Sequence, residues 1–174
     1  MDKLIKDAED VSLSTSDLVK ITEGKSKIIL YSDLDNYKSI DDVLGDDLAV
    51  IILYQTRYDF GHWVGLTKDK NDLLTFFDPY GLSLDEELKF STFNLRQHQG
   101  RMVPHLSALI RESGYKIIEN KIQLQELLEH VNTCGRWVGL FIRMRDLGLK
   151  KFQNLFLNQK ETGDYYVSAI TLLF

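Results

Sequence analysis

Three residues of this chain have the types and the sequence context that thiol chemistry needs. Cys134 is the only cysteine and opens an apolar stretch. Upstream of it, His62 is followed by Trp63, and Asp78 is followed by Pro79. A cysteine thiolate attacks a carbonyl carbon when an imidazole takes and returns the proton and a carboxylate fixes the tautomer of that imidazole. The three residue types therefore predict a nucleophile, its base and an orienting acid.

The helix predicted after Cys134 places the thiol where it can be activated. Apolar positions recur at helical spacing up to Gly148, at Trp137, Val138, Leu140, Phe141, Ile142, Met144 and Leu147. They predict a largely buried helix with Cys134 at its N-terminus, and a helix N-terminus and an adjacent imidazolium both stabilise a thiolate. Gly135 would let a substrate backbone and a strand approach closely, and the amide of Cys134 could donate to an oxyanion. The simpler interpretation of Cys134 is a small buried hydrophobe.

His62 and Asp78 fall on two predicted neighbouring strands. Residues 62–67 and 73–78 are rich in apolar side chains and are separated by a polar stretch, which predicts a hairpin. A spacing of 16 residues returns a hairpin to the same end, so the two side chains should be neighbours. Pro79 favours an extended Asp78 and presents its carboxylate at a strand end. The alternatives are an Asp78 that bonds only its local turn and a His62 that is a satisfied interior side chain.

The remaining pattern predicts one α+β domain over residues 1–174, since no linker or repeat divides the chain. Residues 48–54 form a continuous apolar, β-branched run, which predicts the first strand of the sheet, buried on both faces. Other predicted elements are a capped helix from Ser39 to Gly45, a helix from Pro104 to Gly114 with a strand at 115–118, and a helix from Lys151 followed by an apolar end, 165–174, packed against the sheet. We therefore expect a mixed β-sheet core packed against a buried central helix that carries Cys134, with further helices around it.

Composition restricts the function classes. A hydrophobic content of 44% is enough for a core at this length, and one cysteine allows neither an internal disulfide nor a cysteine-rich zinc site. The formal net charge of -5 gives no attraction to phosphate backbones, so nucleic acid is not an expected partner. We see no signal core and no apolar run of about 18 residues, so we expect a soluble protein of a reducing compartment with no membrane partner. Metal and cofactor are not expected, and structural or surface roles remain for His98, His105 and His130.

Read together, these flanks resemble the adenovirus protease and SUMO-protease superfamily of cysteine peptidases, whose chain order is His, then Asp or Glu, then Gln, then Cys. The matching residues are His62-Trp63, Asp78 and Cys134-Gly135, within residues 48–148. The run from Thr133 to Trp137 is most similar to maturation proteases of large DNA viruses and virophages, since cellular SUMO proteases usually show Asp-Cys-Gly. The resemblance implies a nucleophilic Cys134, a general base His62 and an orienting Asp78.

The resemblance also implies a glutamine that donates to the oxyanion, and in the family this glutamine normally stands closer to the cysteine than any glutamine does here. Gln125 stands nine residues ahead of Cys134 and Gln123 eleven. We assign Gln125, with residues 126–132 as a longer excursion, and keep Gln123 or the Asn132 side chain as alternatives. The residues expected to line or support the substrate groove are Trp63, Gly135 and Trp137.

The resemblance implies an endopeptidase that cleaves viral capsid or core precursors near glycine during virion maturation. It would act as a monomer in the host-cell cytoplasm, the viral factory or the virion interior. The alternatives are a protease for ubiquitin-like or SUMO-like conjugates, an acetyltransferase that shares the residue order, and a binding module without chemistry. The lack of an evident basic patch for coenzyme phosphates weakens the acetyltransferase interpretation.

Adenovirus protease is assisted by DNA and a short peptide, so the resemblance raises the question of a peptide or DNA activator. The acidic balance of this chain argues against the DNA, because phosphate binding needs a basic surface. A local basic patch would have to come from Arg136, Arg143, Arg145, Lys150 and Lys151. The simpler interpretation of these residues is a solvated helix edge.

Overall fold

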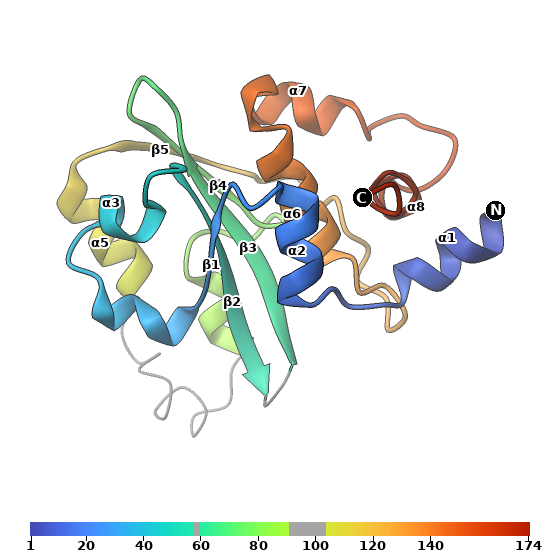
Figure 1. The fold of residues 1–174 in the computed structure, drawn as a ribbon, viewed down its shortest axis with the longest axis horizontal. Coiled ribbons are helices and arrows are strands. Elements are labelled where there is room, and N and C mark those ends of the chain that lie inside the picture. The colour runs from blue at the N-terminus through green and yellow to red at the C-terminus, as the bar shows by residue number, and fades with distance from the viewer. Residues whose placement is uncertain (58–59, 91–103) are drawn as a thin grey trace.

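The computed structural model describes residues 1–57, 60–90 and 104–174 and shows a five-stranded mixed sheet in the order β1-β2-β3-β4-β5 (Figure 1). The strands are β1 Lys27–Leu30, β2 Ala49–Arg57, β3 Phe60–Lys68, β4 Leu73–Phe77 and β5 Lys116–Glu119. The pairs β1/β2 and β4/β5 are parallel, and the two central pairs are antiparallel. The predicted α+β class, with a mixed sheet and surrounding helices, is confirmed.

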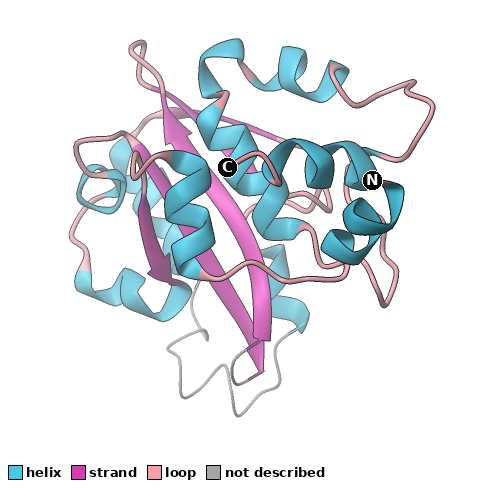
Figure 2. Cartoon of the chain, turned by 45° about the vertical axis from the view of Figure 1, so that its right-hand side comes forward, coloured by secondary structure: helices cyan, strands magenta, loops and turns pink. Residues whose placement is uncertain are grey.

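Helices cover both faces of this sheet (Figure 2). One face packs against α2 Thr15–Thr22, α6 Cys134–Arg143 and α7 Leu149–Asn154, with α8 Gly163–Thr171 behind α6. The other face packs against the 3-10 helix η1 Tyr31–Asn36, α3 Ile40–Leu44 and α5 His105–Ser113. In β2, Ala49 and Ile51 belong to the first of these cores and Val50 and Ile52 to the second. A strand with both faces buried reads as a continuous apolar run, which is why the sequence revealed it.

Helix α6 is the buried central helix that the sequence predicts. Every residue from Cys134 to Ile142 is buried. The Phe141 ring stacks on Phe77 of β4 with centroids 4.4 Å apart. Gly65 of β3 lets the helix approach closely, because a Cβ at this position would lie 3.1 Å from a methyl group of Val138. The helix ends at Arg143 and continues as a 3-10 turn, η3 Arg145–Leu147, so its end lies slightly earlier than predicted.

Two parts of the fold differ from the sequence prediction. The sheet starts at β1, not at residue 48, because a four-residue strand at the sheet edge carries too short an apolar pattern to stand out. The C-terminal end, predicted to pack against the sheet, forms α8, which packs on α6 and on α1 Asp2–Glu9 (Figure 1). The Tyr165 hydroxyl donates to Asp2 at 3.0 Å and joins these two terminal helices. Across the described residues, no helix combines the length and apolar character needed to cross a bilayer.

Candidate active site

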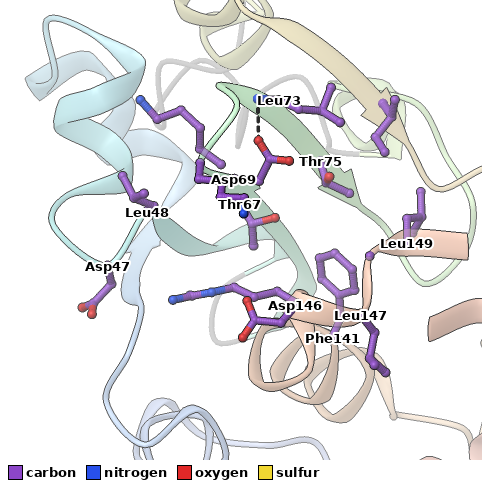
Figure 3. A pocket seen from close by; sticks show the side chains of 15 residues that line it. Asp47, Leu48, Thr67, Asp69, Leu73, Thr75, Phe141, Asp146, Leu147 and Leu149 are labelled. Carbon is purple, nitrogen blue, oxygen red and sulfur yellow. Dashed lines mark hydrogen bonds between the residues drawn. The ribbon is translucent and has the colours of Figure 1, made fainter. Parts of the chain in front are cut away.

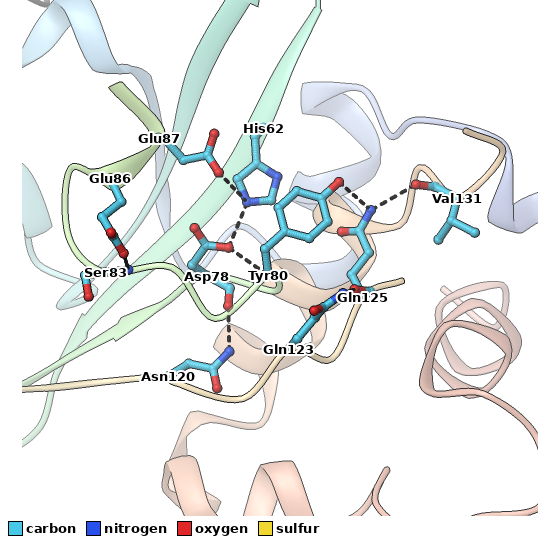
Figure 4. Close-up of polar contacts among 10 residues, drawn as sticks. All are labelled: His62, Asp78, Tyr80, Ser83, Glu86, Glu87, Asn120, Gln123, Gln125 and Val131. Atoms are coloured by element: carbon cyan, nitrogen blue, oxygen red, sulfur yellow. Dashed lines mark hydrogen bonds and ion pairs between the residues drawn. The ribbon is translucent and has the colours of Figure 1, made fainter. Parts of the chain in front are cut away.

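The hairpin β3/β4 brings His62 and Asp78 together. His62 is the third residue of β3, Asp78 directly follows β4, and the antiparallel pairing returns both to one end of the sheet. His62 Nε2 lies 2.9 Å from Asp78 Oδ1, and the two side chains are 7% and 0% exposed. Asp78 Oδ1 also accepts from the Tyr80 amide at 2.7 Å, so the carboxylate bonds its local turn as well as the imidazole (Figure 4).

Asp78 is held from behind by Asn120, which follows β5. The Asn120 side-chain amide donates to the Asp78 carbonyl oxygen at 2.5 Å, and its Oδ1 accepts from Gln153 Nε2 at 2.7 Å. The Gly81 amide donates to the same carbonyl at 2.9 Å, and its φ of +74° closes the turn in the left-handed region that favours glycine. The backbone of Asp78 is therefore held by Gly81 of its own turn and by Asn120, which Gln153 of α7 supports in turn. The sequence did not predict the contacts of Asn120 and Gln153.

Cys134 lies on the other side of His62, at the first turn of α6. The thiol is close enough to the imidazole to raise its pKa, and the residue is 9% exposed. Because Nε2 faces Asp78, the ring presents Nδ1 on its opposite edge. Burial disfavours the charged ring, but the bonds to Asp78 and to Cys134 and the charges on these two groups outweigh it. The pKa of His62 therefore lies well above the ordinary histidine value.

Gly135 is required by close packing, but its neighbours come from this chain. A Cβ there would lie 3.2 Å from Leu13 Cβ and 3.2 Å from Trp63 Cδ1. Trp63 of β3 and Leu13 both lie close to this glycine, which agrees with the predicted close approach of a strand; its role toward a substrate backbone stays a prediction. Trp63 of β3 is 8% exposed and belongs to the same buried cluster as Cys134.

Tyr80 and Gln125 complete the surroundings of the imidazole. The Tyr80 ring stacks on His62 with centroids 4.4 Å apart. Gln125 is buried, and its Nε2 donates to the Tyr80 hydroxyl at 3.2 Å and to the Val131 carbonyl at 2.9 Å (Figure 4). Burial, followed by the charge of Cys134, raises the pKa of Tyr80 above its usual range, so this hydroxyl stays protonated. Tyr80 was seen in the sequence only as a turn residue.

The two alternatives to Gln125 are engaged elsewhere. Gln123 Nε2 donates to the Gln125 carbonyl at 3.0 Å. Asn132 Nδ2 donates to the carbonyl and the carboxylate of Asp10, at 2.9 and 3.2 Å. Gln125 is thus the candidate that reaches the imidazole, through Tyr80, and its role as oxyanion donor stays a prediction.

Asp164 of α8 holds the loop that precedes Cys134. Nothing in the sequence marks this residue except its place in a first helical turn. Its carboxylate accepts from the Thr133 hydroxyl, from Trp137 Nε1 at 2.8 Å and from the Glu126 amide at 2.8 Å. Burial raises the pKa of Asp164. Trp137 is fully buried, so of its two expected roles it can support the site but does not line a groove.

The comparisons with known proteins agree with this architecture. No family model matches the chain. The uncharacterized protein V9 of Sputnik virophage is 32% identical over 174 residues, covering 98% of this chain and 99% of that protein. This chain belongs to the V9 family. Among solved structures, the ASFV pS273R protease aligns with a TM-score of 0.50 and 13% identity over 97% of this chain and 70% of that one. The V9-family chain therefore has the fold of a viral protease.

A second solved structure is the central domain of the uncharacterized Lpg1148 protein from Legionella pneumophila. It aligns with a TM-score of 0.45 and 13% identity, over 93% of the V9-family chain and 94% of its own.

One group of side chains in the described part of this V9-family chain has the geometry to hold a metal ion. His62, Asp78 and Glu87 each offer a ligand atom, all within 4.8 Å of one another and all buried. A cation bound to Nε2 would displace the proton that this nitrogen shares with Asp78, and the ring could then no longer take a proton from Cys134 at Nδ1. The cluster therefore fits an acid–base site better than a resident metal.

Two arginines of the suspected basic patch, Arg136 and Arg143, bond to groups of the N-terminal helices. Arg136 is 5% exposed and donates to the Ala8 carbonyl and to Thr171. Arg143 donates to the Ile21 carbonyl at 2.8 Å and pairs with Glu23. These two side chains join the N-terminal helices to α6, so of the suspected patch only Arg145, Lys150 and Lys151 remain toward the surface.

The other histidines of the V9-family chain lie apart from the site. His105 pairs with Asp35 at 3.0 Å, and the His130 side chain is 81% exposed beside Asp10. His98, with Gln97 and Gln99, lies outside the described residues. A pocket of about 590 Å³ lies at the opposite end of β3, around Lys68 and Arg145 (Figure 3). None of the predicted site residues is in its described lining.

Proposed function

We propose that this chain is a cysteine endopeptidase of the adenovirus-protease type. The observation that carries the proposal is the buried imidazole of His62, with Asp78 on one ring nitrogen and Cys134 near enough to raise the pKa of the ring, at the head of a helix in a viral protease fold. A structural cysteine and histidine would need no carboxylate on the far side of the ring. A nucleophile and a base need that arrangement.

The reaction follows from the positions of these groups. The Cys134 thiolate attacks the peptide carbonyl carbon while His62 holds the proton, and the carbonyl oxygen becomes an oxyanion. The amide of Cys134 and one N–H of Gln125, turned away from Tyr80, stabilise that oxyanion. His62 then gives its proton to the leaving amine, and a thioester remains. Water, deprotonated by His62, attacks the thioester and releases the carboxylic acid and the thiol.

The proposed substrates are viral capsid or core precursors cleaved near glycine during virion maturation. The virophage relative supports a viral setting, and the low exposure of Cys134 and Trp63 supports a narrow approach that suits a residue without a side chain. The enzyme would act as a monomer in the host-cell cytoplasm, the viral factory or the virion interior, with no metal or cofactor.

The test is to incubate purified protein with the structural precursor proteins encoded alongside it and to identify the new termini by mass spectrometry. The wild type should cleave, whereas Cys134→Ala and His62→Ala should not. His105→Ala is the matched control, because His105 also pairs with a carboxylate, at a partly exposed site. Equal cleavage by His62→Ala and the wild type would overturn the assignment.

A second experiment separates the substrate from the chemistry. Electrophilic ubiquitin and SUMO probes that end in glycine should label Cys134 poorly compared with a short glycine-ended peptide probe. Efficient labelling by either protein probe, without cleavage of any precursor, would replace the maturation role with deconjugation.

A further inference from the structure

A second buried carboxylate faces His62, and the proposed triad does not use it. Glu87 lies on the 3-10 helix η2 Glu86–Phe90, and its side chain is 6% exposed. Its Oε1 lies 3.9 Å from His62 Nε2, the nitrogen that Asp78 Oδ1 contacts at 2.9 Å (Figure 4). Glutamates are almost never buried to this degree unless they are paired. One imidazole nitrogen therefore faces two carboxylates from different elements.

The position of Glu87 is set by well-anchored neighbours. Asp85, two residues earlier, accepts from the hydroxyls of Tyr31 and Tyr54 at 2.8 and 3.0 Å. Its other oxygen accepts from the Ser107 amide at 2.9 Å, so it ties η2 to α5. The two tyrosines are fully buried in the core. The backbone that carries Glu87 is thus fixed to the sheet and to a helix, and the carboxylate stays beside the imidazole.

We propose that Glu87 is a positioning residue that holds His62 as the imidazolium and keeps its Nε2 edge turned toward Asp78. It rests on the proposed function only in naming His62 as the base. Glu87 acts through charge, since 3.9 Å is too long for a hydrogen bond and Asp78 takes the Nε2 proton. Opposite charges at this distance attract strongly where water is excluded. With Nε2 held on this side, Nδ1 stays directed at Cys134.

The groups that face His62 come from every element packed around it. They are Tyr54 of β2, Asp78 after β4, Tyr80 of the turn, Glu87 of η2 and Cys134 of α6. Burial raises the pKa of both tyrosines above the usual range, so they remain neutral. Asp78 and Cys134 raise the pKa of His62, and the Glu87 carboxylate is a further acidic group 3.9 Å from Nε2. Among the described residues, Asp78 Oδ2 has no hydrogen-bond partner, so Asp78 meets the imidazole through Oδ1 alone.

The test compares two adjacent glutamates. Glu87→Gln removes the buried charge, whereas Glu86→Gln removes a charge that bonds Ser83 and Lys89 and faces away from the imidazole. The readouts are the His62 titration by NMR of the imidazole and the alkaline limb of kcat/KM. In Glu87→Gln the His62 pKa should fall and the alkaline limb should move to lower pH, with kcat reduced roughly tenfold and KM unchanged. Glu86→Gln should match the wild type.

Identical His62 titrations in Glu87→Gln, Glu86→Gln and the wild type would overturn the proposal. Should Glu87→Gln not fold, Glu87→Asp keeps the charge one carbon further away, and its His62 titration should stay closer to the wild type than that of Asp78→Asn; an equal fall would overturn the proposal too. The double variant Asp78→Asn/Glu87→Gln should lose more kcat than the product of the single losses, because each carboxylate holds the ring when the other is gone. A purely multiplicative loss would refute this sharing.

The NMR readout separates this inference from the proposed function. It needs no substrate, so a His62 titration that responds to Glu87 in a protein without peptidase activity would leave the positioning role standing and remove the peptidase. Conversely, cleavage that depends on Cys134 and His62 but not on Glu87 would leave the peptidase standing alone.

Discussion

Strand β3 carries a cation–carboxylate pair at each end, and the two ends differ in burial and in chemistry. At one end His62 faces Asp78, with side chains 7% and 0% exposed. At the other end Lys68 Nζ lies 2.5 Å from Asp41 Oδ1, with side chains 10% and 49% exposed. Tyr115 donates to Asp41 and places its ring beneath the ammonium at 4.5 Å. The hydrogen bond to Asp41 raises the pKa of Lys68, so both cations have raised pKa values.

The contrast shows that a shifted pKa and a pocket do not by themselves mark a functional site. Lys68 stays charged at any physiological pH, so its pair cannot exchange a proton. The pocket of about 590 Å³ lies at this end (Figure 3). At the other end, burying the carboxylates beside His62 costs solvation that an exposed pair does not lose. Only the buried end has a group that can both take and return a proton.

The sharpest way to break this contrast is to neutralise one carboxylate at each end. Asp78→Asn should lower kcat roughly 10²-fold, because the amide no longer stabilises the imidazolium or fixes its tautomer. Asp41→Asn should leave kcat unchanged. Turnover of a glycine-containing precursor peptide checks both variants, and equal losses would show that the two ends are not functionally distinct.

A second prediction concerns the groups that make the buried end rigid. Asp164→Ala leaves the buried Thr133 and Trp137 donors and the Glu126 amide without their acceptor and should lower the free energy of unfolding by about 1–3 kcal/mol. It should also slow alkylation of Cys134. At the other end, Asp69 accepts from the Asn71 and Leu73 amides in an exposed hairpin turn. Asp69→Ala should cost less, and urea unfolding of both variants measures the difference.

The third prediction is a pH dependence of stability that only the buried end should show. Because the folded-state pKa of His62 is raised, its pair stabilises the fold fully below the ordinary histidine pKa of about 6.5, and this contribution is lost as the pH rises through the raised value. His62→Gln should therefore be less stable than the wild type at pH 6, on the order of 1 kcal/mol, with the gap narrowing in alkali. Unfolding free energies between pH 6 and 10 check it. A gap that widens with pH would contradict the sign.

The smallest expected effect comes from the exposed end itself. Lys68→Met keeps most of the apolar stem and removes the charge, so it should change the free energy of unfolding by less than about 1 kcal/mol. Any change should shrink in high salt, and kcat should not move. A larger, salt-independent loss would mean that this pair behaves like a buried one.

Those parts of the site that depend on regular geometry could be predicted from the sequence. The 16-residue separation of His62 and Asp78 fits a hairpin, and the apolar stripe after Cys134 fits a buried helix; both elements are present. The period of a strand and of a helix is fixed by backbone geometry, so spacing alone places these residues. The catalytic roles assigned to them remain proposals.

The parts that were missed depend on contacts between distant segments. Glu87 and Asp164 look like ordinary acids of short helices in the sequence, and their burial is decided by which segments pack around them. Tyr80 reads as a turn residue, although the turn lays its ring on His62. Nothing local in the sequence shows that Leu13 returns to pack beside Gly135. Side-chain partners across long sequence separations leave no periodic signal.

The bond between Thr133 and Asp164 joins residues 31 positions apart, so it can form only late in the synthesis of the chain. A ribosome makes His62, Asp78 and Cys134 well before it makes α8. Until that helix emerges and docks, the Thr133 hydroxyl lacks its acceptor. The incomplete chain then contains His62, Asp78 and Cys134, but the loop ahead of the thiol is not yet held in place. In a proposed protease, this order of assembly would delay cutting until synthesis of the domain is nearly complete.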